Sequence, residues 1–366
     1  ANPFKNLGMD NPNGSQRYYI GHVNWTGFNG LMEYTGSEKF SAVLQVGTSS
    51  QDYQWEGFYT AAPDTKSRVV TVNGGYIKGG ANYRANDNSN FFFNVGQIMR
   101  PPSFDGVFPN ADYDFEEADE ILNESFTSFE LGYGFRSSNF KGTINAYHTV
   151  WGDRTLRRST SIDDQGVRII YSGVEQTHQG IEGEMTWYPS SRLRVKGMFS
   201  LGDWKYTKNF QGDAYFIDNN QPAGTTGTLY LDGVKIGDAA QTVLYLGFDY
   251  KLTSKLSVDL DMMSYDNLHG RFGPLDSEFN SANNRGSIKL PSWGTADLGA
   301  TYSFSLLGYD ARARLNVNNL FDEEYLSQSQ TNFHNDGGRT WNGINVENNV
   351  YFGKGTTWNL GLNINF

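Results

Sequence analysis

The stretch Gln241–Met262, QTVLYLGFDYKLTSKLSVDLDM, decides the fold class. Apolar side chains occupy every second position from Leu244 to Tyr250 and again from Leu256 to Met262, which is the period of a β-strand. The short polar link at 252–254 separates the two runs, so the stretch predicts an antiparallel hairpin. In the second run the alternate positions carry acids. Each predicted strand therefore has one apolar face and one polar face.

The same alternation recurs along nearly the whole chain, and helical periodicity of useful length is absent. The chain is therefore predicted to be all-β. Thirteen segments are predicted as strands, and residues 16–25 are a candidate for a fourteenth. The thirteen start near residues 27, 38, 69, 90, 124, 140, 174, 192, 241, 256, 293, 310 and 356.

The connections between these segments alternate in length. Short turns are expected at 35–37, 86–88, 137–139, 189–191, 252–254 and 307–308. Long polar connections lie between them, at 50–68, 101–123, 153–173, 205–240, 267–292 and 323–355. A transmembrane up-and-down β-barrel has short periplasmic turns and long extracellular loops, whereas a β-sandwich needs no such alternation. We therefore expect an antiparallel up-and-down transmembrane barrel.

Composition excludes several other classes. The 366 residues contain no Cys, so disulfides, thiolate metal sites and Cys nucleophiles are impossible. A net charge of -11 argues against a nucleic-acid partner, which would need a basic face. No apolar run reaches the roughly 18 residues of a membrane helix. The 22 Tyr, 25 Phe and 8 Trp argue against disorder, because disordered chains are poor in aromatics.

The final strand carries a pattern expected of an outer-membrane assembly signal. Apolar residues alternate with Asn and Gly back from a terminal aromatic, at Trp358, Leu360, Leu362, Ile364 and Phe366. An ordinary edge strand is the alternative interpretation.

The polar faces carry charges of both signs, which are too costly for an apolar core and indicate a wet lumen. They are Glu130, Arg136, Glu182, Glu184, Arg192, Arg194, Lys196, Asp259, Asp261, Arg312 and Arg314. Cross-strand ion pairs are expected between the two Glu of 182–184 and the cations of 192–196.

Ligand contacts are expected in or beside the long connections, because functional residues concentrate in loops. The candidates are aromatic and guanidinium side chains: Arg157, Arg158, Trp204, Tyr206, Tyr215, Phe216, Arg339 and Trp341. Interfacial aromatic girdles and plain solvated loops are the alternatives.

Catalytic and metal signatures are absent from the sequence. No known nucleophile, zinc, phosphate or dinucleotide motif occurs, and the five His are scattered. The acidic run 112–120 could bind Ca²⁺ through hard oxygen ligands, but it lacks the spacing of a known cation loop, so a hydrated surface loop is the favoured interpretation. We expect no enzyme activity, no cofactor and no metal.

Several stretches together resemble the barrel of TonB-dependent outer-membrane receptors of the Bacteroidetes type, from about residue 70 to the end. The most specific is VNNLFDEEY at 317–325, combined with the terminal LGLNINF at 360–366. The others are KGGANY (78–83), FNVG (93–96) before RPP (100–102), FELGYG (129–134), INAY (144–147), GIEGE (180–184), SLGDW (200–204) and VYFG (350–353).

The resemblance implies a 22-stranded barrel with an N-terminal plug and a TonB box. Such receptors import ferric siderophores, cobalamin, glycans or peptides with energy from TonB, ExbB and ExbD. This sequence has thirteen or fourteen predicted strands and no recognisable plug or TonB box. It therefore corresponds to the C-terminal part of that barrel. On this hypothesis residues 27–366 are barrel and residues 1–26 are a partial strand or loop at a truncated N-terminus.

The partners that the resemblance implies are outer-membrane lipid and lipopolysaccharide, a small or oligomeric nutrient, and TonB–ExbB–ExbD through the missing plug. A surface lipoprotein as a further partner stays open. The location implied is the outer membrane of a Gram-negative cell. The alternative that stays open is a self-contained 14-stranded barrel acting as a passive or fatty-acid-type channel.

Overall fold

The computed structural model describes residues 19–57, 65–109, 117–118, 120–162, 165–217, 221–273 and 276–365. The side chains of 158–162 and 225–226 lie outside this description. Most of the acidic run 112–120 and the terminal Phe366 also lie outside the described residues, so the Ca²⁺ alternative and the last position of the assembly signal stay predictions.

Within the described residues the chain forms twenty strands, one short helix and one 3-10 turn. They are β1 (Tyr19–Tyr34), β2 (Phe40–Gly57), β3 (Thr65–Lys66), β4 (Val70–Asn86), β5 (Ser89–Arg100), α1 (Phe104–Val107), β6 (Glu124–Arg136), β7 (Phe140–Ile162), β8 (Gln165–Ser190), β9 (Leu193–Tyr206), β10 (Phe210–Phe216), β11 (Pro222–Leu229), β12 (Thr242–Lys251), β13 (Leu256–Asp266), η1 (Ser277–Asn280), β14 (Trp293–Leu306), β15 (Tyr309–Asn318), β16 (Leu326–Ser329), β17 (Thr340–Trp341), β18 (Ile344–Asn345), β19 (Val350–Phe352) and β20 (Thr357–Asn365). No helix among the described residues is long and apolar enough to cross a membrane.

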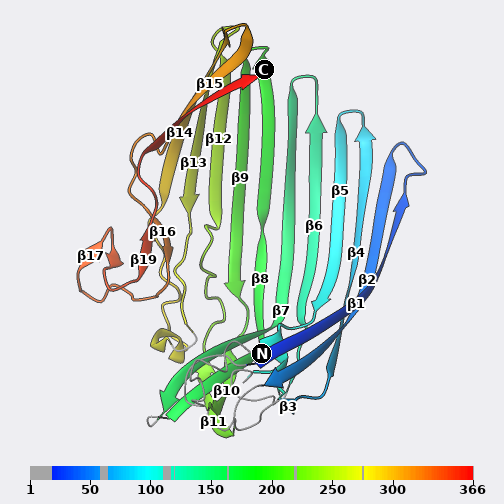
Figure 1. Ribbon diagram of the computed structural model, residues 1–366, viewed down its shortest axis with the longest axis vertical. Coiled ribbons are helices and arrows are strands. Elements are labelled where there is room, and N and C mark those ends of the chain that lie inside the picture. The colour runs from blue at the N-terminus through cyan, green and yellow to red at the C-terminus, as the bar shows by residue number, and fades with distance from the viewer. Residues whose placement is uncertain are drawn as a thin grey trace.

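Thirteen strands form one antiparallel meander (Figure 1). Their order is β1-β2-β4-β5-β6-β7-β8-β9-β12-β13-β14-β15-β20, and β3, β10 and β11 attach beside this path. These thirteen correspond one to one to the thirteen predicted segments, which confirms the all-β prediction. The strands could be predicted because each one has an apolar environment on one side and water on the other. Apolar and polar residues must therefore alternate along it.

Two boundaries differ from the prediction. Residues 19–25 continue without a break into β1, so the fourteenth strand is wrong, and the division expected between residues 26 and 27 lies inside β1. The connection expected at 153–173 is largely a hairpin, because β7 and β8 extend to Ile162 and from Gln165. Val167, Ile169 and Tyr171 alternate there and are buried, so this hairpin has a local core of its own.

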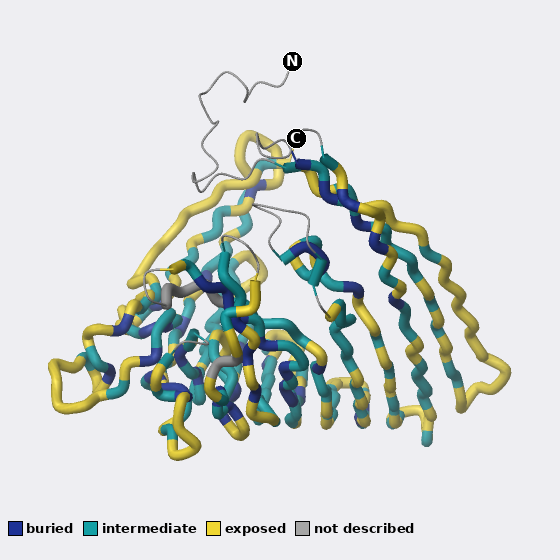
Figure 2. The backbone as a smooth tube through the Cα atoms, turned by 90° about the horizontal axis from the view of Figure 1, so that it is seen from below, coloured by how far each residue is buried: buried dark blue, intermediate teal, exposed yellow. Residues whose placement is uncertain are grey.

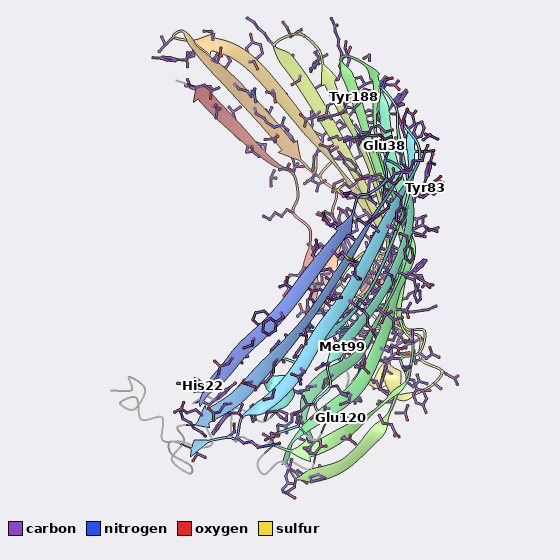
Figure 3. All side chains as sticks on the ribbon, turned by 90° about the vertical axis from the view of Figure 1, so that its right-hand side faces the viewer. His22, Glu38, Tyr83, Met99, Glu120 and Tyr188 are labelled. Atoms are coloured by element: carbon purple, nitrogen blue, oxygen red, sulfur yellow. The ribbon has the colours of Figure 1, made fainter. Side chains whose placement is uncertain are left out.

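The sheet is strongly curved (Figures 2 and 3). One groove is lined by residues from β4 through β12, so the face that carries them is the concave, inner face. The outer face carries a row in cross-strand register from Phe93 through Leu131 and Ala146 to Ile181 and Leu201. Leu131, Ile181 and Leu201 are each about half exposed, at 52%, 48% and 48%. An apolar outer face and a polar inner face are what a bilayer and a wet lumen require.

The two ends of the sheet differ as predicted. The short turns gather at one end, near Glu38 and Tyr188 in Figure 3, and the long connections at the other, near His22 and Glu120. The turn at Leu307–Gly308 has φ values of 53° and 86°, as a two-residue hairpin turn of type I′ requires.

The described strands form an open arc. Among the described residues β1 pairs within the meander only with β2, and β20 pairs only with β15. No contact between the two edge strands closes the sheet there, so the described part is not a 14-stranded closed barrel. Trp358, Leu360 and Leu362 on β20 are 72%, 68% and 60% exposed, and Ile364 is half-buried.

Beyond the wall, the long connections fold together into a body that we call the extracellular cap. It comprises the outer ends of β7 and β8, the strands β10, β11 and β16–β19, and the segments 267–273 and 276–292 with η1. One core joins Val167, Leu229, Leu231 and Phe279, and a second joins Leu268, Leu290, Leu326 and neighbours. The cap is thus built from several connections rather than from independent loops.

The inner-face charges are present, but their predicted pairing is wrong. The β8–β9 register places Glu182 opposite Ser200, whose hydroxyl donates to it at 3.0 Å. Arg194 instead donates to Asp249 of β12 at 2.8 Å, because these two residues are directly opposite. Lys196 lies 3.5 Å from Asp249 and 3.3 Å from Asp261.

Candidate ligand-binding site

Aromatic side chains gather on the inner face where β7, β8 and β9 reach the extracellular end. Three neighbouring rows of the sheet carry them, in the registers Tyr147–Gly180–Gly202, Thr149–His178–Trp204 and Trp151–Gln176–Tyr206. We call Tyr147, Trp151, Arg154, His178, Trp204 and Tyr206 the mouth cluster. Its members are half-buried.

Two glycines make room for the floor of the mouth cluster. The indole nitrogen Nε1 of Trp204 donates to the Tyr147 hydroxyl at 2.8 Å. A Cβ built on Gly202 would lie 2.8 Å from Trp204 Nε1, and one built on Gly180 would lie 2.8 Å from the Tyr147 hydroxyl. Both rings therefore lie flat against bare backbone, which only glycine permits at this distance.

The Trp204 backbone is held by a buried amide from a neighbouring connection. Gln241, only 1% exposed, accepts from Trp204 N at 2.9 Å and donates to Trp204 O at 2.9 Å. His178 packs on the other side of Trp204, with ring centroids 5.5 Å apart. These contacts fix the indole in one orientation.

A column of alternating cations and rings continues the mouth cluster toward β6. The guanidinium of Arg154 lies 3.7 Å from the Trp151 ring centre, and Trp151 stacks on Phe126 with centroids 4.9 Å apart. Arg100 lies 5.6 Å from the Phe126 ring and pairs with Glu124. Arg154 has no such carboxylate partner among the described residues. The outer end of this column therefore carries a guanidinium that forms no ion pair with a described residue.

Four nitrogens here are buried and have no hydrogen-bond partner among the residues that the structure describes. They are Nε of Arg154, Nε of Arg157, Nε1 of Trp151 and Nε2 of His178. A transmembrane strand needs about 9–11 residues, so the two Arg on β7 project beyond the bilayer. Burial lowers the pKa of both guanidinium groups, although Arg keeps its proton. Because buried donors in native proteins nearly always have a partner, this region suits a ligand rich in acceptors.

The predicted residues of the β7–β8–β10 hairpins divide between two faces. Arg157 is opposite Ile170, and Tyr215 is opposite Arg168, so Arg157 and Tyr215 share one face. Phe216 is opposite Val167 on the other face and packs against the cap core. The backbone of Arg158 is opposite Ile169, and its side chain lies outside the described residues.

The last two predicted residues lie on a different element of the cap. Trp341 is in β17 and meets Phe352 edge to face, with centroids 5.2 Å apart, as part of the second cap core. Arg339 is exposed just before β17. In Figure 1 β17 lies beside the β14–β15 end of the sheet, away from β7 and β8. The structure thus groups Trp204 and Tyr206 with Arg154, and it groups Arg157 with Tyr215. Arg339 and Trp341 lie apart from both groups.

Sequence reasoning missed Tyr147, Arg154 and His178, and treated Trp151 as part of an interfacial girdle. The available signal was parity. Tyr147 and Trp151 alternate with Ala146 and Val150, so they belong to the inner face. Which inner-face residues meet across three strands depends on register, which alternation does not give.

No group of three or more His, Asp or Glu side chains in the described part of the chain could hold a metal ion.

A meandering antiparallel sheet with an apolar convex face, a polar concave face and a folded cap is the wall of a transmembrane β-barrel. The chain belongs to the family described as TonB dependent receptor-like, beta-barrel, whose family model matches residues 2–320. The recognition made from the motifs is therefore confirmed. No curated protein matches the sequence.

Solved structures of the same fold are transport receptors. A copper transporter, OprC, is similar with a TM-score of 0.61 and 13% identity over 94% of this chain and 49% of that chain. The ferric-catecholate import receptor Fiu from E. coli K12 is similar with a TM-score of 0.59 and 16% identity, over 95% of this chain and 45% of that chain. The ferric yersiniabactin uptake receptor FyuA from Yersinia pestis is similar with a TM-score of 0.59 and 13% identity, over 95% of this chain and 47% of that chain. The chain thus spans about half the length of these structures.

Proposed function

We propose that the protein is an outer-membrane receptor that binds a scarce nutrient at the mouth cluster and imports it with energy supplied through TonB. Family membership supports the class of function. The observation that carries the binding site is the set of four buried nitrogens, on Arg154, Arg157, Trp151 and His178, that have no hydrogen-bond partner among the described residues. Enzyme activity is not part of this proposal, because the matched family and structures are receptors and transporters.

The ligand class we propose is an anion that carries a planar or ring-shaped part. Arg154 and Arg157 supply charge, and charged hydrogen bonds are roughly twice as strong as neutral ones. The Trp204 and Tyr147 rings supply flat apolar surface for stacking. Ferric siderophores combine both properties, and two structures of the same fold are named for ferric ligands. Glycans and peptides without negative charge fit this site less well.

The partners in this proposal follow from the family. TonB, ExbB and ExbD would act through a plug outside this chain, and a surface lipoprotein is a further candidate. Outer-membrane lipid and lipopolysaccharide would contact the apolar outer face. The proposed location is the outer membrane of a Gram-negative cell.

The test is calorimetric titration of the purified protein in detergent with anionic and neutral ferric siderophores and with neutral oligosaccharides. We expect an anionic chelate to bind, and the double variant Arg154→Gln, Arg157→Gln to weaken it at least tenfold. Arg339→Gln is the matched control, because Arg339 is an exposed guanidinium on another part of the cap. Equal affinity in the double variant, or binding of neutral sugars only, would overturn the site.

A further inference from the structure

A two-residue turn, Asn342–Gly343, joins β17 to β18 in the extracellular cap. The hairpin closes with the pair Trp341–Ile344, so these two residues form the whole turn. Their φ values are 45° and 84°, the left-handed values that a type I′ turn requires at both central positions. Both residues are exposed.

The reactive groups of this turn are free. Among the described residues, no hydrogen bond is made by the Asn342 side chain or by the Gly343 N–H. A Cβ built on Gly343 would meet nothing within 4 Å, so the amide is also unhindered. Because β17 and β18 have only two residues each, and a short hairpin alone is marginally stable, the turn can open while the barrel wall stays folded.

We propose that Asn342 is a site of spontaneous deamidation, with water as the co-reactant. The Gly343 amide nitrogen gives its proton to hydroxide and attacks Cγ of Asn342. The new N–Cγ bond closes a five-membered succinimide, the Cγ–Nδ2 bond breaks, and Nδ2 takes a proton from water and leaves as ammonia. Glycine favours this attack because its nitrogen has no neighbouring side chain and its backbone rotates freely.

Water opens the succinimide in two ways, which give different main chains. Addition at the side-chain carbonyl gives aspartate. Addition at the main-chain carbonyl gives isoaspartate, in which the main chain runs through Cγ and is one atom longer. Because turn length fixes the register of a hairpin, isoaspartate should break the Trp341–Ile344 pair. Ile344 belongs to the second cap core, so this product should also loosen that core.

The same dipeptide occurs twice in the barrel wall, where the backbone is held. Asn29–Gly30 lies inside β1 and is paired in register with β2. Asn73–Gly74 lies inside β4 and is also paired with β2, and the Asn73 carbonyl accepts from Asn123 at 2.7 Å. Ring closure needs rotation about the Cα–C bond of the asparagine, which the ladder prevents. A further Asn-Gly, at 13–14, lies outside the described residues.

The test is peptide mapping by mass spectrometry of the full-length protein, folded in detergent and aged in weakly alkaline buffer. We expect conversion at Asn342 to be faster than at Asn29 or Asn73 by about tenfold or more, since only the turn opens locally. In protein unfolded by urea the three rates should become similar. Asn342→Gln should show no conversion at this position, because a glutamine would have to close a larger ring.

A second measurement separates the two products. Hydrogen exchange of residues 340–345 should lose protection in the isoaspartate form, whereas Asn342→Asp adds the same charge without lengthening the chain and should keep it. The reaction needs no ligand, so its outcome is independent of the proposed binding site. No conversion at Asn342 in the folded protein, an equal rate at Asn29 or Asn73, or equal loss of protection in Asn342→Asp would each overturn the proposal.

Discussion

The Arg154 guanidinium lies 3.7 Å from the centre of the Trp151 ring and finds no carboxylate among the described residues. A cation held by a ring rather than by an acid keeps its charge available to a third group. A buried cation–ring contact contributes up to about 2 kcal/mol, so the guanidinium is positioned without being neutralised. This is the property that a site for an anion needs.

Replacing Arg154 by Lys should weaken the anionic ligand about tenfold, or about 1.4 kcal/mol. Lysine keeps the charge but loses the flat face on Trp151 and the fork of donors. Titration with the chelate found in the ligand screen measures the change. Arg339→Lys should have no effect, and unchanged affinity for Arg154→Lys would show that charge alone is used.

Gly202→Ala should disturb the floor of the mouth cluster, because the added Cβ would lie 2.8 Å from Trp204 Nε1. Overpacking of this kind costs about 1–3 kcal/mol, and it should break the bond from Trp204 to Tyr147. Tryptophan fluorescence and urea unfolding report the two effects. Gly361→Ala is the control, because nothing lies within 4 Å of its Cβ position. Equal stability of both variants would contradict the close approach.

The Glu278–Arg285 pair in the cap should contribute a free energy of unfolding that is kept in mild acid. The Arg285 side chain, through its hydrogen bonds, lowers the pKa of Glu278 from 4.5 to about 2. Because the folded pKa is the lower one, the stabilisation is fully present above about pH 4.5 and is lost as the pH falls through about 2.

Hydrogen exchange of residues 277–286, corrected for intrinsic rates, should therefore show constant protection from pH 7 to 5 and a progressive loss below. Glu278→Gln should be less protected at pH 7 and should differ little from the parent near pH 2. A pH-independent difference between the two proteins would be inconsistent with this titration.

Asn319→Ala should destabilise the return of the chain to its last strand. The buried Asn319 side chain donates to the carbonyls of Glu323 at 3.0 Å and Lys354 at 3.1 Å, and it accepts from Glu323 N at 2.9 Å. Unsatisfied buried groups cost about 1–3 kcal/mol each, so a loss of roughly 2–4 kcal/mol is expected in urea unfolding. Asn318→Ala, exposed and with one hydrogen bond of 3.2 Å, is the control and should be nearly neutral.

Leu360→Arg and Asn359→Arg test which face of β20 meets lipid. Arg on the outer face costs about 2–4 kcal/mol at the bilayer midplane, whereas a lumen position tolerates it. Folding yield into phospholipid vesicles should fall for Leu360→Arg and stay near the parent value for Asn359→Arg. The reverse order would mean that the faces are assigned the wrong way round.

The sheet could be predicted from the sequence because lipid and water act on opposite sides of every strand. Leu256, Val258 and Leu260 carry that information locally, without reference to any partner strand. The cap could not be predicted in this way. Phe279 is buried against Leu229 and Val167, which are far from it in the chain, so no local period marks it.

The sequence predicts which types of side chain form the candidate site, but it does not predict which residues meet there. Trp204 and Tyr206 are predicted from the sequence as aromatic residues in or beside a long connection, but His178 and Trp151 meet them only through the registers of β7, β8 and β9. The ion-pair partners of Arg194 and Lys196 were wrong for the same reason, since Asp249 and Asp261 come from strands farther along the chain.

The shared cores of the extracellular cap also set how its surface can diversify. Arg285 of one connection reaches Asp336 of another, and Arg271 reaches Asp238 of a third. A substitution in one connection therefore alters the fit of its neighbours. Natural variation on this surface is expected to accumulate as coordinated sets of changes across connections, and a transplanted cap should keep its structure only when these connections move together.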